Sequence, residues 1–309
     1  MGESLKDVIR RAHGEVATRA LPATAEEKIH PNYVLPRHLA WMQLPEERRA
    51  WSPEAVQFAY DVLAGKYKKP RDRRISPSSL GDHCERLLLF GFGGWPKEPF
   101  PIPNAEKMAA GEFHHLRWQM EGLSAGYMDM GEAWVHSEAL RCGGSGDGRL
   151  ADGSLFELKS TASHLFDALR NQRGSALNYV MGMHTKHKLQ MEAYWLVDEV
   201  SAAEQGRPRL LTDWGSLVYQ DAGDPQKLLE FRLHSSPSRR AEVHRILEGL
   251  HDWIDLNQLP DMLDACRKAH FGTVGSEVIT DKEQVIYARC PYRRSCPTAT
   301  RVFPLEITA

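Results

Sequence analysis

The segment of residues 156–159, Phe-Glu-Leu-Lys, constrains the fold of this chain more than any other feature of the sequence. Alternate side chains of a β-strand point to opposite faces, so Glu157 and Lys159 share one face and the two apolar residues share the other. Alternating runs also precede this segment over residues 133–142 and 148–151. We therefore predict a β-sheet that buries one face of this strand and presents an acid beside an amine on the other.

The pair Asp152-Gly153 stands between two alternating runs and is typical of a tight β-hairpin turn. If the turn contains two residues, Gly148 lies opposite Glu157, and Asp147 is one residue away from Glu157 across the hairpin. Two carboxylates on neighbouring strands make a hard oxygen site of the kind that binds Mg²⁺ or Mn²⁺. Such an ion polarises a phosphodiester and generates a hydroxide nucleophile.

Lys159 gives this arrangement a catalytic interpretation. An amine beside the ion could orient or deprotonate the attacking water, or neutralise charge that builds on the phosphate oxygens in the transition state. An exposed Glu–Lys salt bridge on a strand would show the same spacing. The glycine-rich approach over residues 144–147 favours the catalytic interpretation.

Apolar residues at helical spacing flank the predicted strands on both sides. The expected helices span residues 1–20, 53–65, 186–197 and 239–256. Two more are expected: a short helix capped by Ser79 that carries Cys84 and ends near the glycines at 91–94, and a long helix from Asn104 to about Leu123. A further strand is expected at 216–221. The order of helices, a β-meander, helices and an irregular tail predicts an α/β or α+β fold.

Charge and hydropathy narrow the classes of partner and location. The formal net charge is -2, so contacts with nucleic acid must come from local patches. One candidate is the run 66–74, whose six basic residues suit either a solvated linker or a phosphate-contacting arm. No apolar run approaches the roughly 18 residues of a membrane span. We expect a cytoplasmic protein, in the host cytoplasm if a phage encodes it, with no membrane partner.

Two further short motifs flank the Asp147, Glu157 and Lys159 set: Gly111–His115 before it and Gln190–Tyr194 after it. In this order the residues resemble the PD-(D/E)XK nuclease superfamily, whose core motif is an Asp, a variable spacer and then Glu-x-Lys on the next strand. The flanking motifs, Gly-x-x-x-His and Gln-x-x-x-Tyr, resemble those of the RecB-like exonuclease branch.

This resemblance implies a role for each matched residue. The catalytic set is Asp147, Glu157 and Lys159, and the implied metal ligands are His115, Asp147, Glu157 and the carbonyl of Leu158. His114 is the neighbouring alternative to His115, and an imidazole ligand would shift the preference from Mg²⁺ toward Mn²⁺. Gln190 and Tyr194, one helical turn apart, would contact a DNA strand or brace Lys159. The nearby His184 and His187 are expected to be exposed.

The cysteines show a second resemblance, to the iron-sulfur subset of RecB-like nucleases, which includes CRISPR-associated and AddB-type proteins. One early cysteine, Cys84, and three late ones, Cys266, Cys290 and Cys296, are implied to hold a [4Fe-4S] cluster that pins the tail to the N-terminal side. Four thiolates would also suit Zn²⁺. Cys142 is expected to be a small buried apolar residue and is the reserve ligand if Cys266 does not serve.

The resemblance implies a restriction-endonuclease-like core, with a central mixed sheet flanked by helices. It implies a metal-dependent exonuclease acting at DNA ends, with 5′ to 3′ degradation of single strands expected by analogy, in recombination, repair or CRISPR adaptation. The alternative is a non-catalytic or partner-dependent DNA-end-binding component with a structural metal cluster. We expect a helical extension with a basic linker over residues 1–75 and the nuclease domain over 76–309. A homo-oligomer or a recombination or adaptation protein is a further possible partner.

Overall fold

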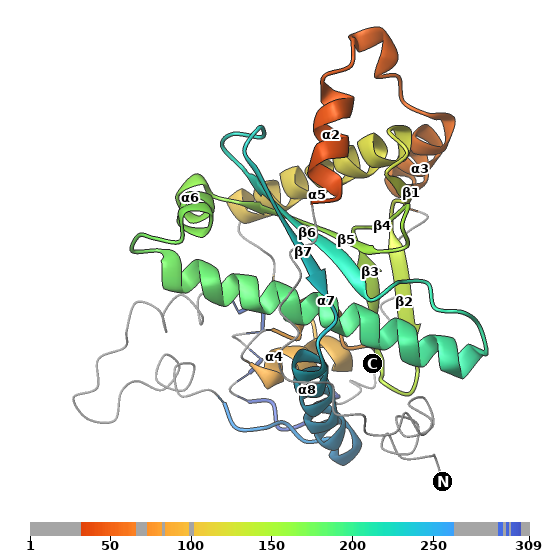
Figure 1. The fold of residues 1–309 in the computed structure, drawn as a ribbon. Coiled ribbons are helices and arrows are strands. Elements are labelled where there is room, and N and C mark those ends of the chain that lie inside the picture. The colour runs from red at the N-terminus through yellow and green to blue at the C-terminus, as the bar shows by residue number, and fades with distance from the viewer. Residues whose placement is uncertain are drawn as a thin grey trace.

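A five-stranded mixed sheet lies at the centre of the computed structural model (Figure 1). The strand order is β1 (Met128–Met130), β4 (Gly148–Leu150), β5 (Leu155–Thr161), β6 (Trp214–Asp221) and β7 (Leu228–His234). Neighbouring strands are antiparallel except β5 and β6, which are parallel. A separate antiparallel pair is formed by β2 (Ala133–Ser137) and β3 (Cys142–Gly146). The structure describes residues 32–65, 73–81, 84–98, 102–262, 290–292, 295–296 and 298–303.

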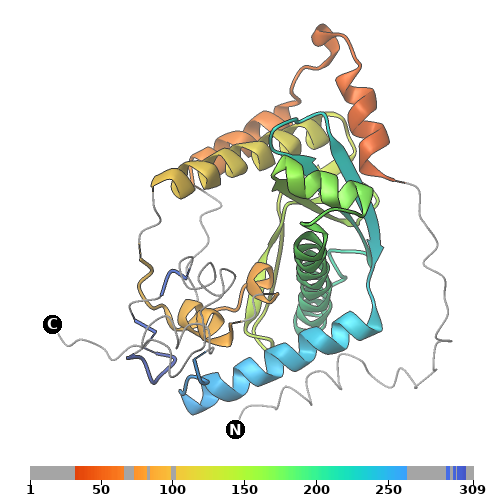
Figure 2. The same ribbon diagram turned by 90° about the vertical axis from the view of Figure 1, so that its left-hand side faces the viewer.

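Helices cover both faces of the sheet (Figures 1 and 2). They are α2 (Val34–Met42), α3 (Pro53–Leu63), α4 (Glu85–Gly93), α5 (Ile102–Ser124), α6 (Ser163–Asn171), α7 (Leu177–Gln205) and α8 (Pro237–Leu256), with short 3₁₀ helices η1 (Glu46–Arg48) and η2 (Pro77–Ser79). On one face Phe156 and Leu158 of β5 pack with Trp118 of α5. On the other face Leu155 packs into the core that contains Trp195 of α7. The predicted mixed sheet with flanking helices is therefore confirmed.

The β4–β5 hairpin has a different register from the predicted one. The backbone N–H of Leu150 donates to the carbonyl of Ser154 at 2.8 Å, so the loop contains three residues rather than two. Gly153 adopts a φ of +80°, the left-handed conformation that such a loop places at its last residue and that glycine adopts without strain. Gly148 consequently pairs with Phe156, not with Glu157. The shift of one residue brings Asp147 to the position opposite Glu157.

Most predicted helices are confirmed, with one wrong start. Ser79 lies in η2, and the short helix α4 begins after Cys84, whose backbone is extended. The helix ends as predicted, because Gly94 adopts a left-handed φ of 76°. The helix expected at residues 1–20 lies outside the described residues.

The helices before residue 75 are attached to the central core. The carboxylate of Glu230 on β7 accepts the backbone N–H groups of Tyr33, Val34 and Leu35 at the start of α2, at 2.9–3.1 Å. A carboxylate at this end satisfies unpaired N–H groups and complements the helix dipole. The division of the chain at residue 75 stays a prediction.

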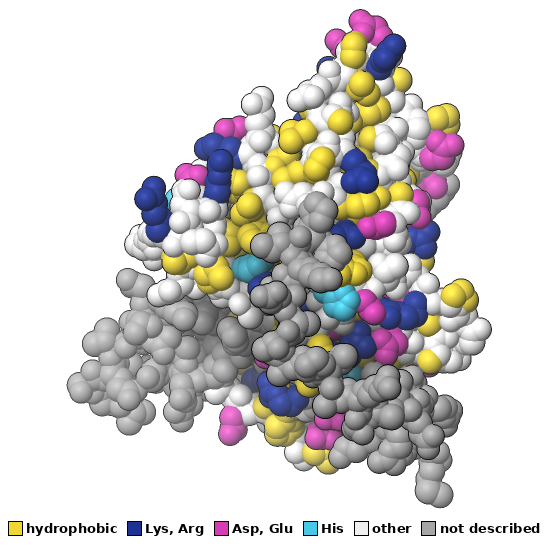
Figure 3. Space-filling model, viewed as in Figure 1, with side chains coloured by type: hydrophobic (Ala, Val, Ile, Leu, Met, Phe, Trp, Pro, Cys, Tyr) yellow, Lys and Arg dark blue, Asp and Glu magenta, His cyan; other side chains and the backbone are white. Residues whose placement is uncertain are grey.

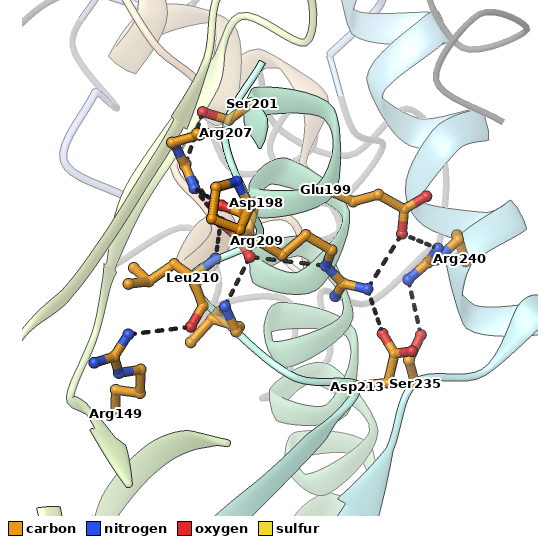
Figure 4. A network of polar contacts seen from close by, with 12 residues as sticks. Arg149, Asp198, Glu199, Ser201, Arg207, Arg209, Leu210, Asp213, Ser235 and Arg240 are labelled. Carbon is orange, nitrogen blue, oxygen red and sulfur yellow. Dashed lines mark hydrogen bonds and ion pairs between the residues drawn. The ribbon is translucent and has the colours of Figure 1, made fainter. Parts of the chain in front are cut away.

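A network of polar contacts joins α7 to the segment that leads into β6 (Figure 4). Asp198 of α7 is fully buried, and its carboxylate accepts the N–H groups of Leu210 at 3.1 Å and Leu211 at 2.8 Å. Arg207 lies 3.4 Å from the same carboxylate. This network fixes the start of β6 against the helix that carries Gln190. Across the described residues, no helix combines the length and apolar character needed to cross a bilayer.

Candidate active site

Asp147 lies between β3 and β4, where both of its carboxylate oxygens have partners. Oδ2 accepts the backbone N–H of Leu158 at 2.8 Å, and Oδ1 lies 2.9 Å from Nδ1 of His115 on α5. Burial raises the pKa of Asp147, but the charges of His115 and Lys159 and the hydrogen bonds outweigh that effect and lower it to about 2. Asp147 is therefore an anchored, ionised carboxylate at neutral pH.

Glu157 is 1% exposed and lies on the face of β5 that contacts α7. The amide Nε2 of Gln190 donates to Oε1 of Glu157 at 2.6 Å, and the hydroxyl of Tyr194 donates to the carbonyl of Ser145 at 2.7 Å. Both side chains thus contact residues around the carboxylates from one face of α7, but they reach Glu157 and β3 rather than Lys159. The expected contact of this pair with DNA stays a prediction.

Oε2 of Glu157 is buried and has no hydrogen-bond partner in the part of the chain that the structure describes. The ammonium of Lys159 lies 3.5 Å from this oxygen. Burial and the neighbouring charge of Asp147 together raise the pKa of Glu157 well above its usual value. Burial lowers the pKa of Lys159, but the two carboxylates outweigh it and raise that pKa, so the lysine stays cationic.

These groups line one cavity of about 410 Å³. Its lining is Arg74, Ser76, Ser78, Trp134, Gly143, Gly144, Ser145, Asp147, Glu157, Lys159, Gln190 and Tyr194. His115 contacts the cavity's Asp147, whereas His114 lines a different cavity beside α2. The helix therefore presents His115, not His114, to the carboxylates.

The donor set fits a divalent cation. In the described part of the chain, no three His, Cys, Asp or Glu side chains already surround a single metal position. The buried oxygen of Glu157 that lacks a hydrogen bond nevertheless lies near the acid of Asp147, and a bound cation would offset both the cost of burying this carboxylate and its repulsion by Asp147. His115 Nδ1 and Asp147 Oδ1 lie 2.9 Å apart, the distance of a hydrogen bond, so a cation bound by both atoms would replace that bond.

The backbone of Leu158 supports the same arrangement. In a strand, the N–H and C=O of one residue point toward the same edge. Because the N–H of Leu158 donates to Asp147, its carbonyl oxygen points to the Asp147 side of β5. Its role as a ligand stays a prediction.

A histidine pair that the sequence placed at the surface is instead packed against the sheet. Nδ1 of His184 and Nδ1 of His187 lie 3.1 Å and 2.8 Å from the hydroxyl of Tyr219. His184 is 3% exposed, so the expected exposure is wrong for this residue. Burial lowers the pKa of His184 to about 4 and that of His187 to about 3, so both are neutral at neutral pH. The sequence alone could not predict this contact, because it depends on the packing of α7 against β6.

Three of the predicted cluster cysteines lie near one another beside α4, but within the described residues their spacing does not already form a metal site. Cys290 and Cys296 pack with Phe90, and Cys84 precedes the same helix. Burial raises the pKa of the thiols of Cys84 and Cys290, and the nearby Cys296 raises both further. The fourth, Cys266, lies outside the described residues.

The tail is also held by a contact that the sequence did not reveal. The guanidinium of Arg86 on α4 donates to the carbonyls of Pro260, Cys296 and Ala299, each at 2.7 Å. Cys142 is fully buried in the main core, and burial raises the pKa of its thiol to about 12. The position of Cys142 agrees with the expected role of a small buried residue. It does not favour Cys142 as the reserve ligand of the cluster, because Cys290 and Cys296 pack in a different cluster of buried residues.

No model of a known protein family matches the chain, and no curated protein matches it. Similar solved structures include an alkaline exonuclease, LHK-Exo, from Laribacter hongkongensis, and LHK-Exo in complex with dAMP. Each is 14% identical to this chain, and each alignment covers 59% of this chain and 88% of that chain. The TM-scores are 0.33 and 0.36, values too low to assign a function.

Proposed function

We propose that this chain is a metal-dependent deoxyribonuclease that hydrolyses phosphodiester bonds at DNA ends. The observation that carries the proposal is the convergence of Asp147, Glu157 and Lys159 in one cavity, with each carboxylate oriented by a separate hydrogen bond. Two acids and an amine in a shared cavity suit the hydrolysis of a phosphodiester, whose transition state gains negative charge on its oxygens.

The protein's own groups have distinct tasks in this reaction. Asp147, Glu157 and the carbonyl of Leu158 would hold Mg²⁺ or Mn²⁺, with His115 as a further ligand. The bound ion would supply Lewis-acid activation of the phosphate and of the attacking water. Lys159, held cationic by the two acids, would orient that water or donate to a phosphate oxygen.

Local basic side chains offset the overall acidity of the chain in this proposal. Figure 3 shows Lys and Arg side chains over α6 and the β6–β7 turn, with Asp and Glu side chains among them, and further Lys and Arg side chains elsewhere on this face. Arg170 in the last turn of α6 and Arg173 just after it are exposed. Such side chains would attract the DNA backbone and make binding sensitive to salt.

The choice of DNA ends, and of 5′ to 3′ degradation of single strands, follows from the resemblance to RecB-like exonucleases. The test is to compare a linear DNA with the same DNA as a covalently closed circle, in Mn²⁺ or Mg²⁺. We expect degradation of the linear form alone. Cutting of the closed circle would replace the exonuclease with an endonuclease, and binding without degradation of either form would support the DNA-end-binding alternative.

We also propose that Cys84, Cys290 and Cys296, with Cys266, hold a [4Fe-4S] cluster, with Zn²⁺ as the alternative occupant. The convergence of three thiols beside α4 supports this proposal. The cluster would act with Arg86 to hold the tail, because it closes a long loop of the chain.

Substitution of Cys290 by Ser is expected to remove the bound metal and to lower the melting temperature, because one thiolate ligand is lost. The wild-type protein should be brown, with broad absorbance near roughly 400 nm. The matched control, Cys142→Ala, should keep its iron. Colourless wild-type protein with stoichiometric zinc would overturn the iron assignment, and wild-type protein without either metal would overturn the site.

A further inference from the structure

The lining of the cavity that contains the carboxylates also includes residues of different chemistry. Beside Asp147, Glu157 and Lys159, the lining includes Arg74 and Trp134. Trp134 is 37% exposed, while Tyr194, the other aromatic residue of the cavity, is 3% exposed. Trp134 is thus the aromatic surface that a molecule bound in the cavity can reach.

The β2–β3 pair explains how Trp134 is presented. Trp134 on β2 pairs with Ser145 on β3, so both side chains point to the same face, and Gly143 lies two residues further along that face. A Cβ atom at Gly143 would lie 3.2 Å from the carbonyl oxygen of Val135 and 3.3 Å from His136, so the two strands approach each other closely at this position.

A cation stands over the same ring. The guanidinium carbon of Arg74 lies 5.9 Å from the centroid of Trp134, within the range of a cation–π contact. Nη2 of Arg74 is also 3.8 Å from Oε1 of Glu138, whose side chain is 81% exposed and therefore a weak competitor. An aromatic face beside a guanidinium is the pairing that binds a nucleobase together with its phosphate.

We propose that Trp134 stacks on the base of the nucleotide next to the scissile phosphate, while Arg74 contacts a neighbouring phosphate. The proposal rests on the proposed function, since the same cavity holds the reacting phosphate. Its volume of about 410 Å³ is within the range of sites for small molecules. Every base has a π-face, so this platform grips the strand without reading its sequence.

The experiment uses single-stranded oligonucleotides in which one abasic position is moved along the first four nucleotides from each end. Binding is measured in EDTA, where no cleavage occurs, and cleavage is measured in Mn²⁺. For the wild-type protein we expect one abasic position to weaken binding roughly 10- to 100-fold. Trp134→Ala should weaken binding of the intact strand by a similar factor, and the abasic position should then cause no further loss of affinity. Trp134→Phe should largely restore the affinity for the intact strand and its dependence on that base.

The matched control is Trp51→Ala, which removes a tryptophan that is 44% exposed and lies outside this cavity. It should bind every oligonucleotide like the wild type. Equal sensitivity of wild type and Trp134→Ala to every abasic position would overturn the stacking site, even if DNA is cleaved. Absence of cleavage with Trp134-dependent binding would instead overturn the nuclease and leave the stacking site supported.

Discussion

Replacement of Glu157 by Gln is expected to reduce DNA cleavage by at least about 1,000-fold without lowering the stability of the metal-free protein. The side chain is 1% exposed, and one of its oxygens has no hydrogen-bond partner among the described residues. Burial and the charge of Asp147 also raise the pKa of Glu157, so its ionised form is disfavoured when no metal is bound. Gln removes the charge and keeps the oxygen that accepts from Gln190, so the metal-free fold loses no favourable contact of this carboxylate except its attraction to Lys159.

Thermal unfolding with and without Mn²⁺ separates this prediction from a general loss of structure. The ion should raise the melting temperature of the wild type, because it binds the folded state alone, and should have little effect on Glu157→Gln. The exposed Glu242 of α8 offers a matched control, and Glu242→Gln should behave like the wild type in both assays. A Glu157→Gln variant that cleaves DNA at the wild-type rate would remove Glu157 from the catalytic set.

Asp198→Ala is expected to destabilise the protein by about 2–5 kcal/mol. The buried carboxylate accepts the backbone N–H groups of Leu210 and Leu211, and alanine would leave both donors unsatisfied (Figure 4). Arg207 would lose its buried partner as well. A change of this size is a large share of the roughly 5–15 kcal/mol that stabilises a typical domain.

Denaturant unfolding measures this effect against a surface ion pair. Arg141 lies 2.6 Å from Asp255, whose side chain is 62% exposed, and solvent screens such pairs strongly. Asp255→Ala should therefore change the free energy of unfolding by less than about 1 kcal/mol. Equal effects of the two substitutions would show that the Asp198 network does not fix β6 against α7.

The strand period was sufficient to predict which residues of β5 share a face. Phe156 and Leu158 pack in the core on one side of the sheet, while Glu157 contacts α7 on the other. The hairpin register was wrong by one residue, because Asp-Gly is compatible with both two-residue and three-residue loops. In both registers Asp147 remains near Glu157, so the error did not change the predicted site.

Contacts between distant elements could not be predicted from local pattern. The spacing of Gln190 and Tyr194 gave their common helix face, but their partners depend on where α7 crosses β5 and β3. The burial of His184 beneath Tyr219 and the cap of α2 by Glu230 likewise depend on tertiary packing. Trp134 carried no signal in the sequence, because alternation on β2 does not tell which face borders the cavity.

The measurement that tests the central claim most directly is the shortening of end-labelled DNA by wild-type protein and by Lys159→Ala, in Mn²⁺ or Mg²⁺ and in EDTA. Lys227→Ala, a lysine of the β6–β7 turn outside the cavity, serves as the matched control. We predict that the wild type and the Lys227→Ala control shorten the DNA progressively when the metal ion is present. This shortening should stop in EDTA, and Lys159→Ala should not shorten the DNA. Metal-dependent shortening that persists in Lys159→Ala, or no shortening by folded wild-type protein, would contradict the proposed active site.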